Sequence, residues 1–337
     1  MTPRDPSRIA PVGMRKTGAA APVFRSPSSS RTAAHAGAVL AFALGLASPF
    51  VVAAPKAAAS PPAVELADTE VRTIASTALG RRYDILVGLP EGYAAQPGRR
   101  YPVLFVTDAN YAFPLVRSIA HMVGDHGHGL EDFVLVGLGY AAGDTPQYSR
   151  RRDYTPTPRG DADARSDMPG RAPLHGEAEA YRRFVATEVF PLVAANYRVD
   201  MKRKILAGHS YGGLFAAHVL LTEPTMFERY VISSPSLWYD DRVVLRRERE
   251  YAATHDDLPA DVLLEAGSYE TLDPVAHDPR YNRSKDMLRD LRLFESRLRA
   301  HRYPHLRIET KVVAGEDHLS VFPVAITRGL QWALPAR

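Results

Sequence analysis

Short continuous apolar runs lie at residues 101–106 and 133–138, and turn or polar residues bound each of them. Such runs are typical of β-strands that are buried on both faces of a sheet. Strand-like segments at 204–207, 230–233, 261–266 and 307–313 continue the series. Two earlier segments, 70–76 and 82–89, predict an antiparallel pair at the start of the sheet.

Segments with helix-compatible apolar spacing lie between these strands, at 177–196, 211–221, 284–302 and 319–334. Within the first of them, Pro191 must kink or split the helix, because proline lacks a backbone donor and clashes with the preceding turn. Strands that alternate with helices predict an α/β fold, in which helices cover both faces of a mostly parallel sheet.

One segment, residues 141–175, breaks this alternation. It is polar, carries five prolines and contains the basic cluster Arg150-Arg151-Arg152. A connection of this length predicts a lid or a flexible insertion. Within it, we expect residues 150–156 to be ordered and residues 159–170 to be mobile.

The first 59 residues differ from the rest. Residues 1–35 lack periodicity and predict a disordered leader, and the apolar, small-residue run 36–54 follows several basic residues. This order predicts a signal peptide with cleavage near Ala54 or Ala59, and hence a periplasmic or secreted protein. The run is long enough to span a bilayer, so an uncleaved anchor is the alternative. We expect one folded domain at 60–337.

The charge balance changes once the leader is set aside. Seven of the 42 Lys and Arg residues lie in the leader, against one of the 38 acidic residues. The remainder is therefore nearly neutral, and the basic overall composition gives no reason to expect a nucleic-acid partner. Cysteine is absent from the sequence, which excludes disulfides and thiolate metal sites.

The pentapeptide Gly208-His209-Ser210-Tyr211-Gly212 closes the predicted strand 204–207 and opens the predicted helix 211–221. A G-x-S-x-G motif in this context predicts a nucleophile elbow, in which a sharp turn exposes the serine hydroxyl above the sheet. Ser210 is therefore the candidate nucleophile.

A serine nucleophile needs a base and an acid, which follow it along the chain in doubly wound hydrolases. Of five histidines well beyond Ser210, His318 comes directly after the last strand and is the candidate base. The candidate acids after the penultimate strand are Glu270, which we prefer, and Asp273. Glu265 ranks lower because it lies inside that strand.

Two backbone amides are expected to bind the oxyanion. One belongs to Tyr211, directly after the nucleophile. The other comes from the loop after strand 101–106, which reads Asp108-Ala109-Asn110-Tyr111, and is the amide of Ala109 or Asn110.

These stretches resemble the esterase D-like branch of the α/β-hydrolases, and most closely the esterases that cleave catecholate-siderophore trilactones such as enterobactin and bacillibactin. The likeness runs from about residue 71 to the end. It implies an α/β-hydrolase fold with a lid-like insertion, and places the family's nucleophile, histidine and acid on Ser210, His318 and Glu270. The stretches that carry it are 82–93, 101–113, 150–156, 176–184, 208–215, 233–238 and 316–318.

The resemblance also bears on binding. It implies Asn110 as the second amide donor, with Ala109 standing where the family commonly has glycine. It places Trp238 beside the pocket, although a tryptophan that packs in the core would look the same. It also gives Arg150 two possible roles, binding substrate within an anion-attracting arginine cluster or pairing with Asp153 to hold the lid.

The sequence therefore predicts an exported serine esterase that acts on aryl or catecholate-siderophore esters. Its expected partner is a small-molecule ester, with no cofactor or metal, and any membrane contact would come only through an uncleaved leader. The alternatives are a general carboxylesterase, a feruloyl-type esterase or an acyltransferase on the same fold, and a non-catalytic siderophore-binding relative. The sequence does not predict an oligomeric state.

Overall fold

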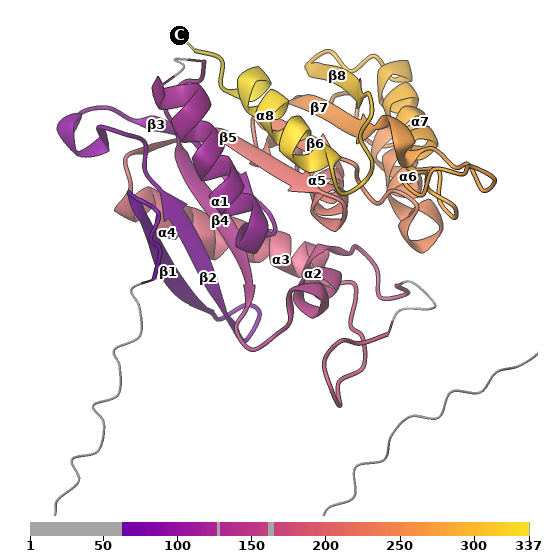
Figure 1. Cartoon of the computed structure of the whole chain (residues 1–337), viewed down its shortest axis with the longest axis horizontal. Helices are drawn as coiled ribbons and strands as arrows, with labels where there is room; N and C mark the ends of the chain where they lie inside the picture. The colour runs from indigo at the N-terminus through magenta and orange to yellow at the C-terminus, as the bar shows by residue number, and fades with distance from the viewer. Residues whose placement is uncertain (1–62, 127–128, 161–164, 337) are drawn as a thin grey trace, which may run out of the picture. The chain divides into compact units, whose positions relative to one another are not determined.

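The computed structural model describes residues 63–126, 129–160 and 165–336, which belong to a compact unit spanning Ala63–Arg337 (Figure 1). The predicted signal peptide and its two cleavage sites lie outside the described residues. Within the described ranges, no helix combines the length and the apolar character that crossing a membrane would require.

The described residues form one eight-stranded sheet with the strand order β1-β2-β4-β3-β5-β6-β7-β8. β2 runs antiparallel to β1 and β4, and all other neighbours are parallel. The strands are β1 (Thr69–Ser76), β2 (Arg81–Gly88), β3 (Tyr101–Val106), β4 (Val134–Ala141), β5 (Val199–His209), β6 (Arg229–Ser233), β7 (Ala260–Gly267) and β8 (Leu306–Val313).

Helices cover both faces of this sheet (Figure 1), as the alternating pattern predicted. The α-helices are α1 (Ala109–Ile119), α2 (Pro146–Tyr154), α3 (Ala178–Phe184), α4 (Phe190–Asn196), α5 (Tyr211–Thr222), α6 (Tyr239–Ala252), α7 (Met287–Ala300) and α8 (Val321–Ala333). Shorter turns are 3₁₀-helical at Tyr93–Ala95, Pro224–Met226 and Ser268–Glu270 and π-helical at Ala120–His126 and Val185–Val189. The fold is that of an α/β-hydrolase.

Two layers of apolar side chains hold the helices to the sheet. On one face, Phe113 of α1 and Ile326 of α8 pack with Ile205 of β5. On the other, Phe184 of α3 and Phe215 of α5 belong to a larger cluster that also receives residues of α6 and α7. The sheet thus has a buried layer on each side, and the carboxyl ends of its parallel strands stay available for a site.

The expected split at Pro191 is confirmed. α3 passes into the π-helical turn Val185–Val189, and Pro191 then lies in the first turn of α4. The helical path continues from the π-helical turn into α4, since Val189 and Phe190 keep helical dihedrals, and this local π adjustment accommodates the amide that proline lacks. Three helices were not predicted, namely α1, α2 and α6.

The insertion 141–175 contains α2, which includes most of the part predicted to be ordered. Buried Arg152 anchors this helix by ion pairs to Asp144 (2.5 Å) and Asp153 (2.8 Å). The hydroxyl of Tyr83 on β2 donates to Asp153 (3.0 Å), which ties α2 to the sheet. Residues 161–164, within the part predicted to be mobile, lie outside the described residues.

Candidate active site

Ser210 lies in the sharp turn between β5 and α5, with φ 58° and ψ −116°. Residues with a Cβ rarely adopt this backbone conformation. A Cβ at Gly208 would lie 2.3 Å from the carbonyl oxygen of Gly212, and one at Gly212 would lie 2.1 Å from Oγ1 of Thr107. The close approach of β5, α5 and β3 therefore requires both glycines, and the turn has the geometry of a nucleophile elbow.

His318 lies between β8 and α8 and reaches back to Ser210. Its Nε2 is 3.1 Å from Oγ of Ser210, and its Nδ1 is 2.8 Å from Oε2 of Glu270. In the tautomer with the proton on Nδ1, the ring donates to the Glu270 carboxylate, and Nε2 can accept from the serine hydroxyl. The structure thus joins the three predicted residues in one chain of hydrogen bonds.

Glu270 is buried at the end of the 3₁₀ turn after β7. Its Oε1 accepts hydrogen bonds from the amide of Gly267 (2.8 Å) and from the hydroxyl of Ser234. These two donors leave Oε2 directed at His318. Sequence reasoning gave Ser234 no role, although its motif, Ser-Ser-Pro-Ser, begins at the last residue of β6, where the parallel strands end.

The other candidates for acid and base have different partners. Asp273 accepts from the amide of Val275 (3.2 Å) and thereby caps a local turn. Among the competing histidines, His301 and His305 bond to carboxylates of Glu248 and Asp257, and His255 stacks on a tyrosine of α6. Geometry therefore selects Glu270 and His318 from the alternatives that the sequence left open.

The two predicted oxyanion donors lie in the first turns of two helices, Tyr211 in α5 and Asn110 in α1. Amides in a helical first turn have no partner within the helix, and the helix dipole adds positive potential there. Asn110 and Ser210 line the same cleft, whereas Ala109 is fully buried. This placement is compatible with the predicted pair of donors.

Asp108 fixes the loop that carries Asn110, a role that the sequence did not suggest. It is fully buried and has a left-handed backbone (φ 55°) just before α1. Its carboxylate accepts from the hydroxyls of Tyr140 (2.6 Å) and Tyr111 (3.2 Å). Burial and the Asp108 charge raise the pKa of both tyrosines above its usual range, so both stay neutral.

Arg150 completes this cluster and differs from the expectation. Its Nε and Nη2 donate to the two oxygens of Asp108 at 3.0 and 3.1 Å, so the expected pair between Arg150 and Asp153 is wrong. Asp153 instead pairs with Arg152 (2.8 Å). Arg151 donates to the carbonyl oxygen of Arg165 (2.6 Å). The arginine cluster is therefore largely committed to internal partners and is not an open anion-attracting patch.

A cleft of about 790 Å³ opens in front of Ser210. This volume lies within the roughly 300–1,000 Å³ typical of small-molecule sites. The insertion contributes Pro146, Gln147, Arg150 and Asp167 to its lining. The segment predicted to be a lid therefore borders the candidate active site.

His209 and Trp238 flank the site in different ways. His209 lines the cleft, and its ring centroid lies 4.8 Å from that of His318. Burial lowers the pKa of His209 well below its usual range, and the neighbouring His318 lowers it further, so the ring is neutral. The ring centroid of Trp238 lies 6.2 Å from that of Tyr211, and Nζ of Lys285 lies 2.9 Å from the Trp238 centroid. Trp238, which the resemblance placed beside the pocket, is not among the residues that line the cleft.

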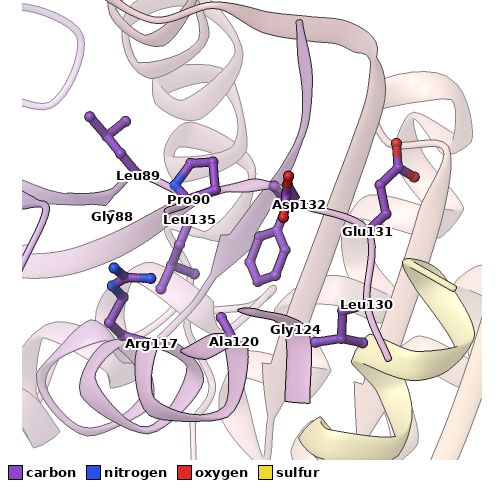
Figure 2. A pocket seen from close by; sticks show the side chains of 11 residues that line it. Gly88, Leu89, Pro90, Arg117, Ala120, Gly124, Leu130, Glu131, Asp132 and Leu135 are labelled. Carbon is purple, nitrogen blue, oxygen red and sulfur yellow. The ribbon is translucent and has the colours of Figure 1, made fainter. Parts of the chain in front are cut away.

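A second hollow lies between the end of β2 and the loop 130–133, and its lining includes Pro90, Arg117 and Leu130 (Figure 2). Its volume of about 20 Å³ is enough for about one water molecule. An ester does not fit there, and none of the three predicted catalytic side chains lines it. The large cleft is therefore the candidate substrate site.

An elbow serine that lines a cleft, a histidine and a buried carboxylate in hydrogen-bonded series are typical of the α/β serine hydrolases. The Esterase family model matches residues 76–308. The ferri-bacillibactin esterase BesA of Bacillus subtilis is 34% identical over 272 residues, which cover 79% of this chain and 89% of that protein. The siderophore triacetylfusarinine C esterase of Aspergillus fumigatus is 30% identical over 268 residues, covering 74% and 88%.

Among solved structures, the BES protein from Bacillus cereus superimposes with a TM-score of 0.65 at 25% sequence identity. The match covers 83% of this chain and 99% of that structure. The chain therefore belongs to the Esterase family and is an ester-hydrolysing serine hydrolase.

Proposed function

We propose that this protein is an exported esterase that hydrolyses siderophore-type aryl or catechol esters, with Ser210 as nucleophile, His318 as base and Glu270 as the orienting acid. The observation that carries the proposal is the unbroken series of hydrogen bonds from Oγ of Ser210 through His318 to Glu270. A buried, doubly held carboxylate at its end fixes the imidazole tautomer that can accept the serine proton.

The reaction proceeds in two stages. Oγ of Ser210 attacks the ester carbonyl while Nε2 of His318 takes its proton, and the same proton then passes to the leaving alcohol. Water next attacks the acyl-enzyme, with His318 again as base, and releases the acid. Glu270 stays ionised and stabilises the imidazolium that forms in each stage.

The amides of Tyr211 and Asn110 bind the oxyanion of each tetrahedral intermediate. Both come from helix N-termini, so the positive ends of α1 and α5 meet where the negative charge develops. Asp108 holds the first residues of α1 in place through Arg150 and Tyr140. A donor of this kind typically contributes about 10²–10³-fold to turnover.

Two features support an aryl-type siderophore ester as substrate. The cleft presents aromatic and apolar side chains close to Ser210, including Tyr111 and Phe322. The two curated relatives reported above are named as siderophore esterases and match most of this chain. The apolar run at 36–54 supports export, with cleavage near Ala54 or Ala59.

The test combines labelling with a substrate panel. Ser210→Ala should abolish both hydrolysis and covalent labelling by a fluorophosphonate, whereas Ser236→Ala, a neighbouring hydroxyl 3.5 Å away, should still be labelled. The panel compares a siderophore trilactone with simple aryl esters and feruloyl esters. Unchanged hydrolysis by the Ser210 variant would refute the mechanism, and higher kcat/KM for the simple esters would refute the substrate class.

Export has its own measurement. Expression of the full chain in a Gram-negative host, followed by N-terminal sequencing of the periplasmic protein, should give a new terminus near residue 55 or 60. An intact leader on membrane-associated protein would favour the anchor instead.

A further inference from the structure

Formal charge is scarce in the cleft. Of the fourteen described residues that line it, Arg150 is the one arginine or lysine and Asp167 is the one carboxylate. His209 also lines it, and its lowered pKa keeps it neutral. The tyrosine hydroxyls at 111 and 140 stay protonated, since their pKa values are raised. Apart from the candidate catalytic histidine, Arg150 is therefore the one side chain among these lining residues that could offer a positive charge to an anionic ligand.

Arg150 is already paired. Its guanidinium makes two parallel hydrogen bonds to the carboxylate of Asp108. Asp108 is completely buried, with an exposed fraction of 0%. Turning Arg150 toward a ligand would leave a buried carboxylate without its cation, which is strongly unfavourable. The pair as a whole carries no net charge, so it offers an anion little attraction.

The neighbouring cations do not replace it. Arg152 is buried between Asp144 and Asp153, and Arg151 donates to a backbone carbonyl. At the cleft, the carboxylate of Asp167 accepts from the hydroxyl of Thr145 (2.6 Å) and has no cation among its partners in the described part of the chain. With the Arg150–Asp108 pair neutral, the carboxylate of Asp167 is the remaining carboxylate or side-chain cation among the described insertion residues that border the cleft.

The wall formed by α1 and α8 is apolar. It consists of Leu115, Leu319, Phe322 and Pro323 together with the ring of Tyr111. Leu319, directly after His318, is 83% exposed. Burying uncharged aromatic surface against such a wall is favourable, whereas a charged ligand would lose hydration there without gaining a counter-charge.

Catecholate siderophores exist in two forms that differ in net charge, the iron-free form and the ferric complex. Iron-free catechol rings are phenols and are uncharged at neutral pH, as the ordinary tyrosine pKa of about 10 illustrates. Binding of a ferric ion by three catechols releases six protons and leaves three negative charges on the complex. Resting on the function proposed above, we infer that this esterase hydrolyses the iron-free, uncharged ester in preference to the ferric tris-catecholate.

The direct test measures kcat/KM of the purified enzyme on iron-free enterobactin and on its ferric complex, in the same buffer. We expect the iron-free form to be at least about 10-fold better. Raising the salt from 50 to 500 mM should change its kcat/KM less than about twofold, since an uncharged ligand is not steered. Equal or greater kcat/KM for the ferric complex would overturn the inference.

Asp167→Asn provides a second readout. Removing this carboxylate should raise kcat/KM for the ferric complex by severalfold relative to the iron-free form. Asp241→Asn, which removes an exposed carboxylate away from the cleft lining, is the matched control. An unchanged ratio in the Asp167 variant would count against the charge argument.

Failure of the proposed substrate class would be seen separately. If neither form of enterobactin is hydrolysed while simple aryl esters are, the siderophore assignment falls. The charge preference is then measured on two aryl esters that differ only in a sulfonate group on the ring. Higher kcat/KM for the sulfonated ester would overturn the inference, and higher kcat/KM for the neutral one would support it.

Discussion

Glu265 is a carboxyl group buried in β7, and replacing it with glutamine should change how stability depends on pH. It is 0% exposed. Strand register places Ser233 of β6 on one side of it and Lys311 of β8 on the other, and Arg328 of α8 is the other nearby charge. Neither carboxyl oxygen has a hydrogen-bond partner among the described residues. Burial therefore disfavours the ionised form, and the two cations offset this only in part.

The direction of the effect follows from the pKa. Burial raises the pKa of Glu265 from 4.5 to about 8 in the folded protein. Between these values the folded protein keeps a proton that the unfolded chain has released, so the free energy of unfolding falls as pH rises. At pH 7 the cost to the folded state is about 3 kcal/mol. Below pH 4.5 this cost disappears.

Glu265→Gln keeps the shape and polarity of the protonated acid but cannot ionise. The free energy of unfolding of the variant minus that of the parent enzyme should increase by about 3 kcal/mol as the pH rises from 4.5 to 7. Urea unfolding followed by circular dichroism at pH 4.5, 5, 6, 7 and 8 gives this difference. Glu309→Gln, which removes an exposed carboxylate from β8, is the matched control for loss of one charge. Parallel stability curves for the parent and the Glu265 variant would refute the reasoning.

Substitutions at three further positions test the site. Glu270→Gln should lower kcat by about 10²–10⁴-fold with little change in KM, because the imidazole loses the partner that fixes its tautomer; an equal loss in Asp273→Asn would contradict the choice of acid. Asp108→Asn should lower the free energy of unfolding by about 3 kcal/mol, since the largely covered Arg150 side chain (16% exposed) loses its counter-charge; a urea midpoint equal to the parent's would contradict this. Ser234→Ala and Ser234→Gly should lower kcat to the same extent, because both lose the hydroxyl that donates to Glu270. The glycine variant should be about 1 kcal/mol more stable than the alanine variant, because the backbone at residue 234 has φ 43°, which glycine adopts without strain. Equal stability of the two Ser234 variants would remove the strain argument.

The strands and the elbow were predictable because they are encoded locally. An apolar run such as Tyr101–Val106 is buried whichever strands flank it, and its predicted bounds match β3. The Gly-x-Ser-x-Gly motif likewise carries its own geometric requirement at Gly208 and Gly212. His318 could be proposed because parallel strands end at a common edge, so a histidine directly after the last strand lies near a serine at the end of another.

The interactions that hold the site in place were not predictable in the same way. Arg150 and its partner Asp108 are 42 residues apart, and the sequence offered Asp153, three residues away, as a more obvious choice. Ser234 and Glu270 are 36 residues apart on different strand ends. Nothing in local periodicity records which polar side chains meet across such separations. The sequence favoured Glu270 but left Asp273 open for a related reason, since one short loop carries both residues and only its folded path separates them.

Three residues with a strained backbone lie where the parallel strands end. Asp108 follows β3, Ser210 follows β5 and Ser234 follows β6, and each has positive φ although none is glycine. Such conformations cost on the order of 1–3 kcal/mol each and persist only where surrounding contacts enforce them. Here the contacts differ: Asp108 is held by Arg150 and two tyrosines, Ser234 by its hydrogen bond to Glu270, and Ser210 by the close packing of α5 on β5. Each strained turn positions a different part of the site: Asp108 the loop that carries the Asn110 amide, Ser210 the nucleophile, and Ser234 a hydrogen bond to the acid Glu270. The conformational cost at these strand ends therefore accompanies the placement of the catalytic groups at one edge of the sheet.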